Sequence, residues 1–238
     1  KDYTTGYSDI VLKEINPNGT FDSLYIYENT NRAVAIYDFN KDGKLQLHLR
    51  REEYDTLNNW PVDRQLYFDK ETDTSLAFDL SFIFQVPGEG EPQLFHRYYD
   101  LDGDELTDVL YINNVKRQMR IYEYNPAINN FDSVYSFDYS NIDAWIEGFQ
   151  VGDFDQDGKP EFFIGGASGQ VYGFESNSVA YLNTWTGQVE THNAFLFAET
   201  NDIDGNGKKE FWIGGDSFFS GVPITRLTCF EAFGNNSY

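Results

Sequence analysis

The stretch that decides the fold lies at residues 149–166 and has the sequence FQVGDFDQDGKPEFFIGG. Asp153, Asp155 and Asp157 occupy alternate positions, Gly158 follows them, and Glu161 comes four residues after Asp157. Carboxylates this close together repel one another and have raised pKa values unless a cation lies between them. The spacing therefore predicts a cation-binding loop.

The oxygen donors of this loop favour Ca²⁺. A hard cation of this kind takes about 6–8 oxygen ligands at roughly 2.3–2.6 Å, and alternate residues of a tight loop can all point inward. An EF-hand loop would need Glu at its twelfth position and helices on both sides. The twelfth residue here is Ile164, and the flanking runs FQV and EFFI are typical of strands. We therefore expect a strand-loop-strand calcium site.

Three further stretches follow the same plan, so that the sequence predicts up to four Ca²⁺ ions. The predicted ligands, of which the fourth in each set binds through its backbone carbonyl, are Asp38, Asn40, Asp42, Lys44 and Gln46; Asp100, Asp102, Asp104, Leu106 and Asp108; Asp153, Asp155, Asp157, Lys159 and Glu161; and Asp202, Asp204, Asn206, Lys208 and Glu210. The motifs begin at positions 38, 100, 153 and 202, which are 62, 53 and 49 residues apart. A period of about 50 residues with strand-like segments indicates a propeller or a similar array.

The four loops are not equivalent. The third is complete, the fourth has Asn206 in place of an acid, the second has Glu105 where the others have glycine, and the first has Asn40 and Gln46 in place of two acids. Because ligand charge and loop rigidity set the affinity, we expect it to fall in that order. Turns rich in Asp, Asn and Gly also occur without any ion, but four copies with one spacing argue against that interpretation.

These stretches resemble the FG-GAP or VCBS-type repeat, the calcium-binding blade motif of integrin alpha-subunit propellers and of many secreted bacterial proteins. VGDFDQDGKPEFFIGG and ETNDIDGNGKKEFWIGG fit the repeat closely, and YDFNKDGKLQLHL and YYDLDGDELTDVLYI fit it less well. The resemblance implies an all-β fold, a β-propeller of four-stranded antiparallel blades. It also implies that each metal lies in the loop between the first two strands of its blade.

The repeat spacing gives about four and a half blades, in a partial or unusually small propeller. We expect the outer half of a blade at 1–32, complete blades at 33–93, 94–146 and 147–193, and an incomplete blade at 194–238. In the third blade the outer strands are expected near Val171–Glu175 and Val179–Trp185, followed by a turn at Thr186 and Gly187. We favour a fragment of a larger propeller. The alternatives are a small ring of four or five blades, in which residues 1–32 complete the last blade, and a ring completed by another chain.

Composition excludes several classes of function. The 238 residues are 18% aromatic, which suits sheets filled by large rings, and carry a formal charge of −22. Four Ca²⁺ ions would bring this to about −14, and no basic patch exists to bind nucleic acid. No apolar run reaches the ~18 residues of a membrane span, and Cys229 is the only cysteine.

Weak calcium sites fill outside the cell but not in the cytosol, so we expect a secreted or cell-surface protein.

The sequence holds few candidates for catalysis. His48, His96 and His192 share no motif, and no nucleophile elbow, HExxH or phosphate-binding glycine loop is present. His96 and Arg97 form the one pair of catalytic residue types on a predicted strand. Trp60, in a predicted loop beside Pro61, is the best aromatic candidate for stacking on a sugar or a protein. For each of these, an ordinary packing role is the simpler interpretation.

We therefore expect a non-enzymatic, calcium-stabilised propeller that acts in recognition or adhesion or as a structural subunit of a cell-surface assembly. Its partners would be a protein or carbohydrate ligand at the cell surface, with other chains completing the ring or an assembly. The alternative is an enzyme on a propeller scaffold, a polysaccharide lyase or hydrolase that uses His96 and Arg97. Fold alone does not decide between the two, because propellers support many functions.

Overall fold

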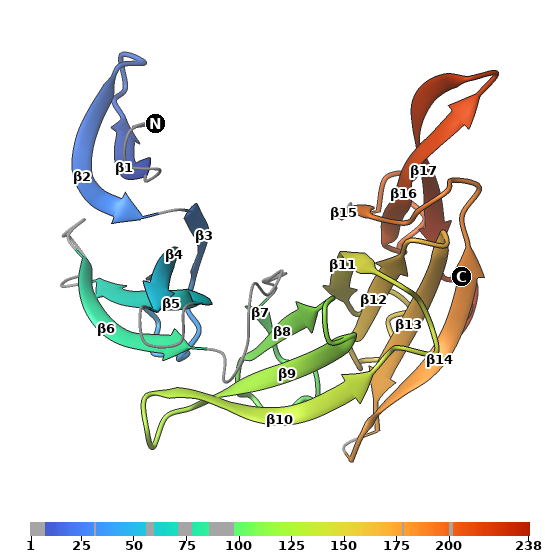
Figure 1. Cartoon of the computed structure of the whole chain (residues 1–238), viewed down its shortest axis with the longest axis horizontal. Helices are drawn as coiled ribbons and strands as arrows, with labels where there is room; N and C mark the ends of the chain where they lie inside the picture. The colour runs from blue at the N-terminus through green and yellow to red at the C-terminus, as the bar shows by residue number, and fades with distance from the viewer. Residues whose placement is uncertain are drawn as a thin grey trace. The chain divides into compact units, whose positions relative to one another are not determined.

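The computed structural model describes residues 8–30, 32–55, 60–70, 78–85, 98–177, 179–199 and 202–238. Within these ranges every regular element is a strand, and the strands form antiparallel sheets (Figure 1). The all-β fold class predicted from the sequence is confirmed.

The strands of the first half are β1 (Ser8–Ile15), β2 (Phe21–Thr30), β3 (Arg32–Tyr37), β4 (Gln46–Asp55), β5 (Trp60–Lys70), β6 (Phe78–Gln85), β7 (Tyr98–Tyr99), β8 (Asp108–Asn113) and β9 (Gln118–Asn125). Those of the second half are β10 (Asn130–Asp138), β11 (Ile146–Gly152), β12 (Glu161–Gly166), β13 (Gln170–Ser176), β14 (Tyr181–Gln188), β15 (Leu196–Glu199), β16 (Glu210–Phe219) and β17 (Val222–Glu231).

Three sheets contain four strands each in simple sequence order, β3-β4-β5-β6, β7-β8-β9-β10 and β11-β12-β13-β14. The strands β15-β16-β17 form a three-stranded sheet, and β1 pairs with β2. A four-stranded sheet in up-and-down order is the blade of a propeller. The sheet order therefore agrees with the predicted propeller class, with a two-stranded sheet first and a three-stranded sheet last in the described residues.

By its internal contacts the chain divides into two units. The first comprises Lys1–Pro92 and Tyr124–Asp132, and the second comprises Gln93–Glu123 and Ser133–Tyr238. In the first unit, aromatic rings pack edge to face and in stacks around Phe39, whose ring centroid lies 4.9 Å from that of Tyr67 and 5.5 Å from that of Phe82. This unit thus has a core of its own.

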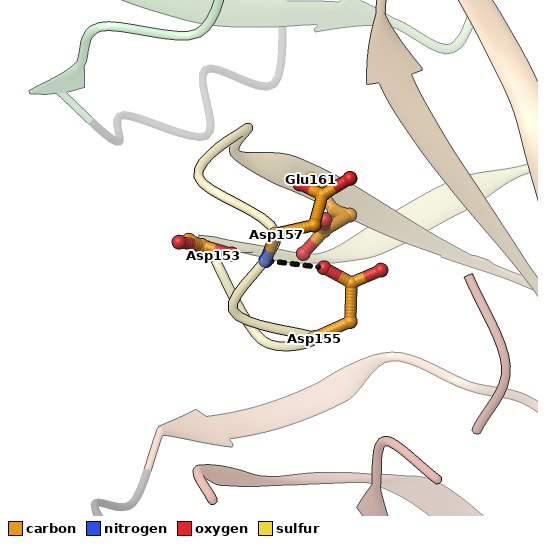
Figure 2. Close-up of side chains that lie close together, drawn as sticks. All are labelled: Asp153, Asp155, Asp157 and Glu161. Atoms are coloured by element: carbon orange, nitrogen blue, oxygen red, sulfur yellow. Dashed lines mark hydrogen bonds between the residues drawn. The ribbon is translucent and has the colours of Figure 1, made fainter. Parts of the chain in front are cut away.

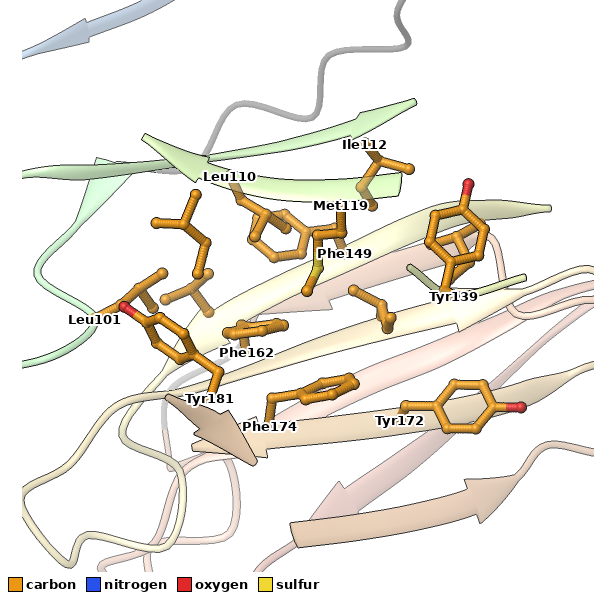
Figure 3. Packing of buried hydrophobic residues seen from close by; sticks show 14 residues of the cluster. Leu101, Leu110, Ile112, Met119, Tyr139, Phe149, Phe162, Tyr172, Phe174 and Tyr181 are labelled. Carbon is orange, nitrogen blue, oxygen red and sulfur yellow. The ribbon is translucent and has the colours of Figure 1, made fainter. Parts of the chain in front are cut away.

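In the second unit, strand β12 supplies two cores because its side chains alternate between the two faces of its sheet. Phe162 and Ile164 belong to a cluster that they share with Leu110 and Met119 of the preceding sheet (Figure 3). Phe163, between them, faces the opposite way and packs on Phe211 of the following sheet, with ring centroids 4.5 Å apart. Every residue of β12 is buried, as expected of a strand covered on both faces.

The outer strands differ in burial, and the structure corrects two sequence-based predictions there. β14 is exposed along most of its length, and it includes Thr186 and Gly187, so these two residues continue the strand and do not form the predicted turn. Trp60 begins β5 and pairs with Asp55 of β4, so it does not lie in a loop. Gly187 gave a false turn signal because the ring of Trp185 lies over its Cα, where a Cβ would come within 2.3 Å of the indole.

Replacement of Phe162 by alanine tests the core of the second unit. The side chain is fully buried and stacks on Phe174 at 5.0 Å between ring centroids. We expect Phe162→Ala to lower the free energy of unfolding by about 3–5 kcal/mol, since it removes the ring and leaves a cavity. Val179→Ala, at a side chain that is 91% exposed, should change it by less than about 0.5 kcal/mol. Denaturant unfolding measures both, and equal effects would contradict the packing described here.

Candidate metal centres

Each predicted loop joins the first two strands of a sheet. The loops span residues 38–46, 100–108, 153–161 and 202–210, and the last residue of each is the first residue of the next strand, β4, β8, β12 or β16. The short connection brings the loop's side chains back over the point where the strand begins. This is the position that the family resemblance predicts for the metal.

The closing side chain ties each loop to its strand. An oxygen of this side chain accepts a hydrogen bond from the backbone N–H of the loop's second residue. The four bonds are Phe39 to Gln46 at 3.0 Å, and Leu101 to Asp108, Phe154 to Glu161 and Ile203 to Glu210 at 2.8 Å each. One closing oxygen is thereby used inside each loop, and the second oxygen of Asp108 and of Glu161 has no hydrogen-bond partner among the described residues.

A second hydrogen bond shapes every loop from within. The first aspartate accepts it from the backbone N–H of the sixth residue, at 2.9 Å for Asp38 and Asp100, 3.2 Å for Asp153 and 2.7 Å for Asp202. The same bond at the same place in all four loops shows that they share one backbone conformation, although their sequences differ.

The fourth and sixth residues of every loop have positive φ. The pairs are Lys41 (54°) and Gly43 (85°), Gly103 (80°) and Glu105 (71°), Gln156 (61°) and Gly158 (90°), and Gly205 (78°) and Gly207 (92°). Glycine adopts this conformation readily, whereas other residues lose about 1–2 kcal/mol. Glu105 adopts it all the same, so the missing glycine does not alter the second loop.

The third loop forms the largest group of carboxylates among the described residues. Asp153, Asp155, Asp157 and Glu161 offer one oxygen each, and these four atoms lie within 4.8 Å of one another (Figure 2). Glu161 is fully buried, and its Oε1 has no hydrogen-bond partner among the described residues; the same is true of Asp153 Oδ1. Buried anionic oxygens without partners are costly, and oxygen donors of this kind fit Ca²⁺.

The second and fourth loops form smaller groups of the same kind. Asp100, Asp102 and Asp108 lie within the same limit in the second loop, and Asp202, Asp204 and Glu210 do so in the fourth. Asp108 is 1% exposed, and its Oδ1 lacks a hydrogen-bond partner in the described part of the chain. Both loops therefore bring together most of the carboxylates that the sequence assigns to them.

The first loop is satisfied in a different way. The side-chain amide of Gln46 uses Oε1 to accept from Phe39, and its Nε2 donates to Asn40 Oδ1 at 2.9 Å. A donor thus stands where the other loops direct a second carboxylate oxygen. Asp38 and Asp42 are the only carboxylates among its predicted ligands. The structure brings the predicted residues together here, but they bond to one another.

The seventh residues, Lys44, Leu106, Lys159 and Lys208, are the predicted carbonyl ligands. Their backbone N–H groups each donate to the side chain two residues earlier, Asp42, Asp104, Asp157 or Asn206, at 2.8–2.9 Å. This bond holds the fifth side chain of each loop in place. Ligation through the four carbonyls stays a prediction.

Without a cation, the buried closing acids resist ionisation. Burial, followed by the charges of neighbouring aspartates, raises the pKa of Glu161 to about 8, against the lowering effect of its bond from Phe154. Burial likewise raises the pKa of Asp108 to about 8, and the charges of Asp102, Glu123 and Asp104 add to this. A divalent cation would reverse the effect because it favours the charged form.

One feature of the sites was not predicted from the sequence. An acidic residue on the third strand of each sheet that contains a loop lies directly opposite the closing residue. The pairs are Gln46 with Asp69, Asp108 with Glu123, Glu161 with Glu175, and Glu210 with Glu231. Directly opposed residues project from the same face of a sheet. The chain separations vary between 14 and 23 residues, so no fixed spacing could reveal these acids.

The segment after β17 contacts the third loop. Asn236 N donates to Asp155 Oδ2 and Asn235 Nδ2 donates to Asp157 Oδ2, both at 2.6 Å. The ring of Tyr238 packs against Phe163 and Trp185, with centroids 5.1 and 5.4 Å away. Residues far along the chain thus hold two of the carboxylates from outside the loop.

The histidines do not form a catalytic group in the described residues. His48 is 1% exposed, stacks on Tyr67 at 4.4 Å between ring centroids, and shares a 2.8 Å hydrogen bond with Gln65. Burial lowers the pKa of His48 to about 4, so that the ring is neutral and serves in packing. His192 is exposed, and His96 and Arg97, the predicted catalytic pair, lie outside the described residues.

Two substitutions at Glu105 test the backbone of the second loop. Both Glu105→Gly and Glu105→Ala remove the charged group, but only the glycine variant also removes the Cβ that disfavours the positive φ of this residue. We expect the glycine variant to be about 1 kcal/mol more stable than the alanine variant. Thermal or denaturant unfolding of both variants measures the difference. Equal stability would mean that residue 105 does not adopt a left-handed conformation in solution.

The pKa values of the closing acids predict how stability depends on pH when no metal is bound. The carboxyls of Glu161 and Asp108 have pKa values of about 8 in the folded chain, against about 4 when unfolded. Between these values the folded chain binds more protons, so its stability falls as the pH rises from 5 to 8. Unfolding of the metal-free protein across this range measures the trend. A rise in stability over the same range would contradict it.

Comparisons with known proteins bear on the family. A model of the FG-GAP-like repeat matches residues 100–164, which run from the first residue of the second motif into β12. No curated protein matches the chain. Among solved structures, the chain is similar to the crystal structure of the exotype rhamnogalacturonan lyase YesX, with 14% identity and a TM-score of 0.45, over 85% of this chain and 41% of that one. The chain thus spans about two fifths of the length of that lyase. The match at residues 100–164 confirms the family resemblance there: the chain contains an FG-GAP-like repeat.

Proposed function

We propose that the acidic loops bind Ca²⁺ and that the chain is a calcium-stabilised module without enzymatic activity of its own. The observation that carries the proposal is the third loop, where Asp153 Oδ1 and Glu161 Oε1 are buried without hydrogen-bond partners among the described residues. The oxygens of its four carboxylates converge within 4.8 Å. A cation among them would supply the missing partner and offset their repulsion.

The role of the calcium in this proposal is structural. Each loop joins the first two strands of a sheet, and its closing residue already belongs to the second strand. An ion held by both ends of the loop would fix the two strands to each other. It would also remove part of the repulsion within a chain whose formal charge is −22. Folding and calcium binding would then be linked, as in other proteins whose metal sites form only in the native state.

A location outside the cell follows from this chemistry. Strand-loop-strand sites with exposed aspartates bind weakly enough to need the millimolar calcium of extracellular fluids. The described part of the chain holds no helix with the length and hydropathy that a membrane crossing requires. We therefore propose a secreted or cell-surface protein.

The partner in this proposal is a protein or a carbohydrate at the cell surface, and the module acts in recognition, adhesion or assembly. The enzyme alternative rests on His96 and Arg97, which lie outside the described residues, and no observation favours it. A panel of acidic polysaccharides separates the two. Cleavage that His96→Ala and Arg97→Ala abolish would replace the binding module with the enzyme, whereas calcium-dependent retention without cleavage supports the module.

Calcium titration of the metal-free chain tests the central claim. We expect calorimetry to show binding and the melting temperature to rise, because each site adds about 2.7 kcal/mol of stability at one hundred times its Kd. Glu161→Gln should remove most of the contribution of the third loop. Glu147→Gln, which removes an equal charge from β11 outside the loops, should leave it intact. If neither calcium nor a chelator changes the melting temperature, the proposal is wrong.

A further inference from the structure

The acidic residue opposite each closing residue differs in its surroundings from one repeat to the next. In the third repeat, Lys159 Nζ lies 2.8 Å from Glu175 Oε1 and neutralises it. In the fourth, Lys208 Nζ lies 3.5 Å from Glu231 Oε1. Both lysines are the seventh residue of their own motif. In these two repeats the third-strand carboxylate is therefore paired with a cation that the loop itself supplies.

The second repeat lacks this lysine. Its seventh residue is Leu106, so the loop provides no positive charge for Glu123. The carboxylate of Glu123 instead groups with those of Asp102 and Asp104, and one oxygen of each lies within 4.8 Å of the others. Neither Glu175 nor Glu231 belongs to such a group among the described residues. The exchange of lysine for leucine thus coincides with the entry of a further carboxylate into the site.

A second observation points to a ligand at this place. Asp108 stands opposite Glu123 and is 1% exposed. Its Oδ2 accepts the hydrogen bond from Leu101, and its Oδ1 has no hydrogen-bond partner in the described part of the chain. Asp108 forms a group with Asp100 and Asp102, in which one oxygen of each lies within 4.8 Å of the others, and Asp102 also belongs to the group of Glu123. A buried carboxylate with an unpartnered oxygen therefore shares Asp102 with the group of carboxylates that Glu123 joins.

We propose that Glu123 is a metal ligand, the fifth carboxylate of the second site, and that this site takes hard cations more strongly than the third site does. The five carboxylates are Asp100, Asp102, Asp104, Asp108 and Glu123, which form two groups that share Asp102, whereas the third loop has four carboxylates in one group. Attraction for a cation grows with the charge of the ligands and of the ion. The second site therefore has the strongest preference of the four for a trivalent ion such as Tb³⁺ over Ca²⁺. This inference rests on the proposed function, because it assumes that the loops bind calcium.

The proposal reverses part of the affinity order expected from the motifs. By the motif alone, the second loop ranks below the third and the fourth because Glu105 replaces its glycine. The left-handed φ of Glu105, at 71°, keeps the loop in the shared conformation. With the backbone equal, ligand charge decides the order, and Glu123 adds to that charge.

Site-resolved titration of the full chain tests the role of Glu123. The amides of Gly103 and Gly158 each donate to the first aspartate of their own loop, at 2.8 and 3.2 Å, so their NMR signals report on the second and third sites separately. We expect Glu123→Gln to weaken Ca²⁺ binding at the Gly103 loop by about tenfold or more and Tb³⁺ binding by a larger factor. Leu106→Lys, which introduces the pairing seen in the third and fourth repeats, should weaken both as well.

Glu175→Gln is the matched control, because it removes the equivalent acid where a lysine already neutralises it. It should leave binding at the Gly158 loop within about threefold of the unchanged chain. Glu123→Gln should also raise the melting temperature of the metal-free chain, since it relieves repulsion, while it reduces the rise that calcium causes. A residue with a purely structural role would lower the melting temperature in both states.

The outcomes separate the two claims. If neither glycine signal responds to Ca²⁺, the proposed function is wrong and this inference is overturned with it. If both signals respond but Glu123→Gln leaves the Gly103 loop unchanged, calcium binding stands and the role of Glu123 is overturned. An equal loss at both loops would likewise contradict it, because the substitution would then act through the fold.

Discussion

The hydrogen bond between a loop's second amide and its closing side chain is the constraint on which the metal centres depend. It recurs in all four loops, whether the closing residue is Asp, Glu or Gln. Because one closing oxygen is held in this way, the direction of the other atom is fixed. In three loops that atom is a carboxylate oxygen, and in the first it is the amide nitrogen of Gln46. The same backbone thus yields a cation site or a closed hydrogen-bond network, depending on one side-chain group.

The fold was predictable because its signals are local and repeated. The apolar run EFFI at 161–164 indicated a strand, and the structure assigns Phe162, Phe163 and Ile164 to two separate cores on its two faces. The repeat of the acidic motif located the first two strands of the sheets. Trp60 and Gly187 were misjudged because a tryptophan beside proline and a Thr-Gly pair are frequent in loops, whereas here cross-strand pairing and the ring of Trp185 override that local preference.

The metal centres were predictable in part. The side-chain ligands within each loop follow from a fixed spacing, and the structure brings them together in the second, third and fourth loops. Glu123 could not be found in this way, because its place opposite Asp108 depends on the register of β8 with β9. The hydrogen bond from Gln46 Nε2 to Asn40 Oδ1 could not be predicted either, since it depends on whether the oxygen or the nitrogen of the Gln46 amide faces into the loop. Register and amide orientation are properties of the folded chain and leave no periodic trace in the sequence.

The segment from Glu231 to Tyr238 gives the last sheet a mechanical connection to its neighbour. Asn235 and Asn236 of this segment donate hydrogen bonds to the carboxylates of Asp157 and Asp155 in the third loop. Lys208 of the fourth loop donates to the backbone carbonyl of Ala232 at 2.6 Å. Tension applied at Tyr238 would therefore load these hydrogen bonds and the surrounding ring contacts before it could peel β17 from β16. The third and fourth loops, which lie on successive sheets, are thus both hydrogen-bonded to the same C-terminal segment.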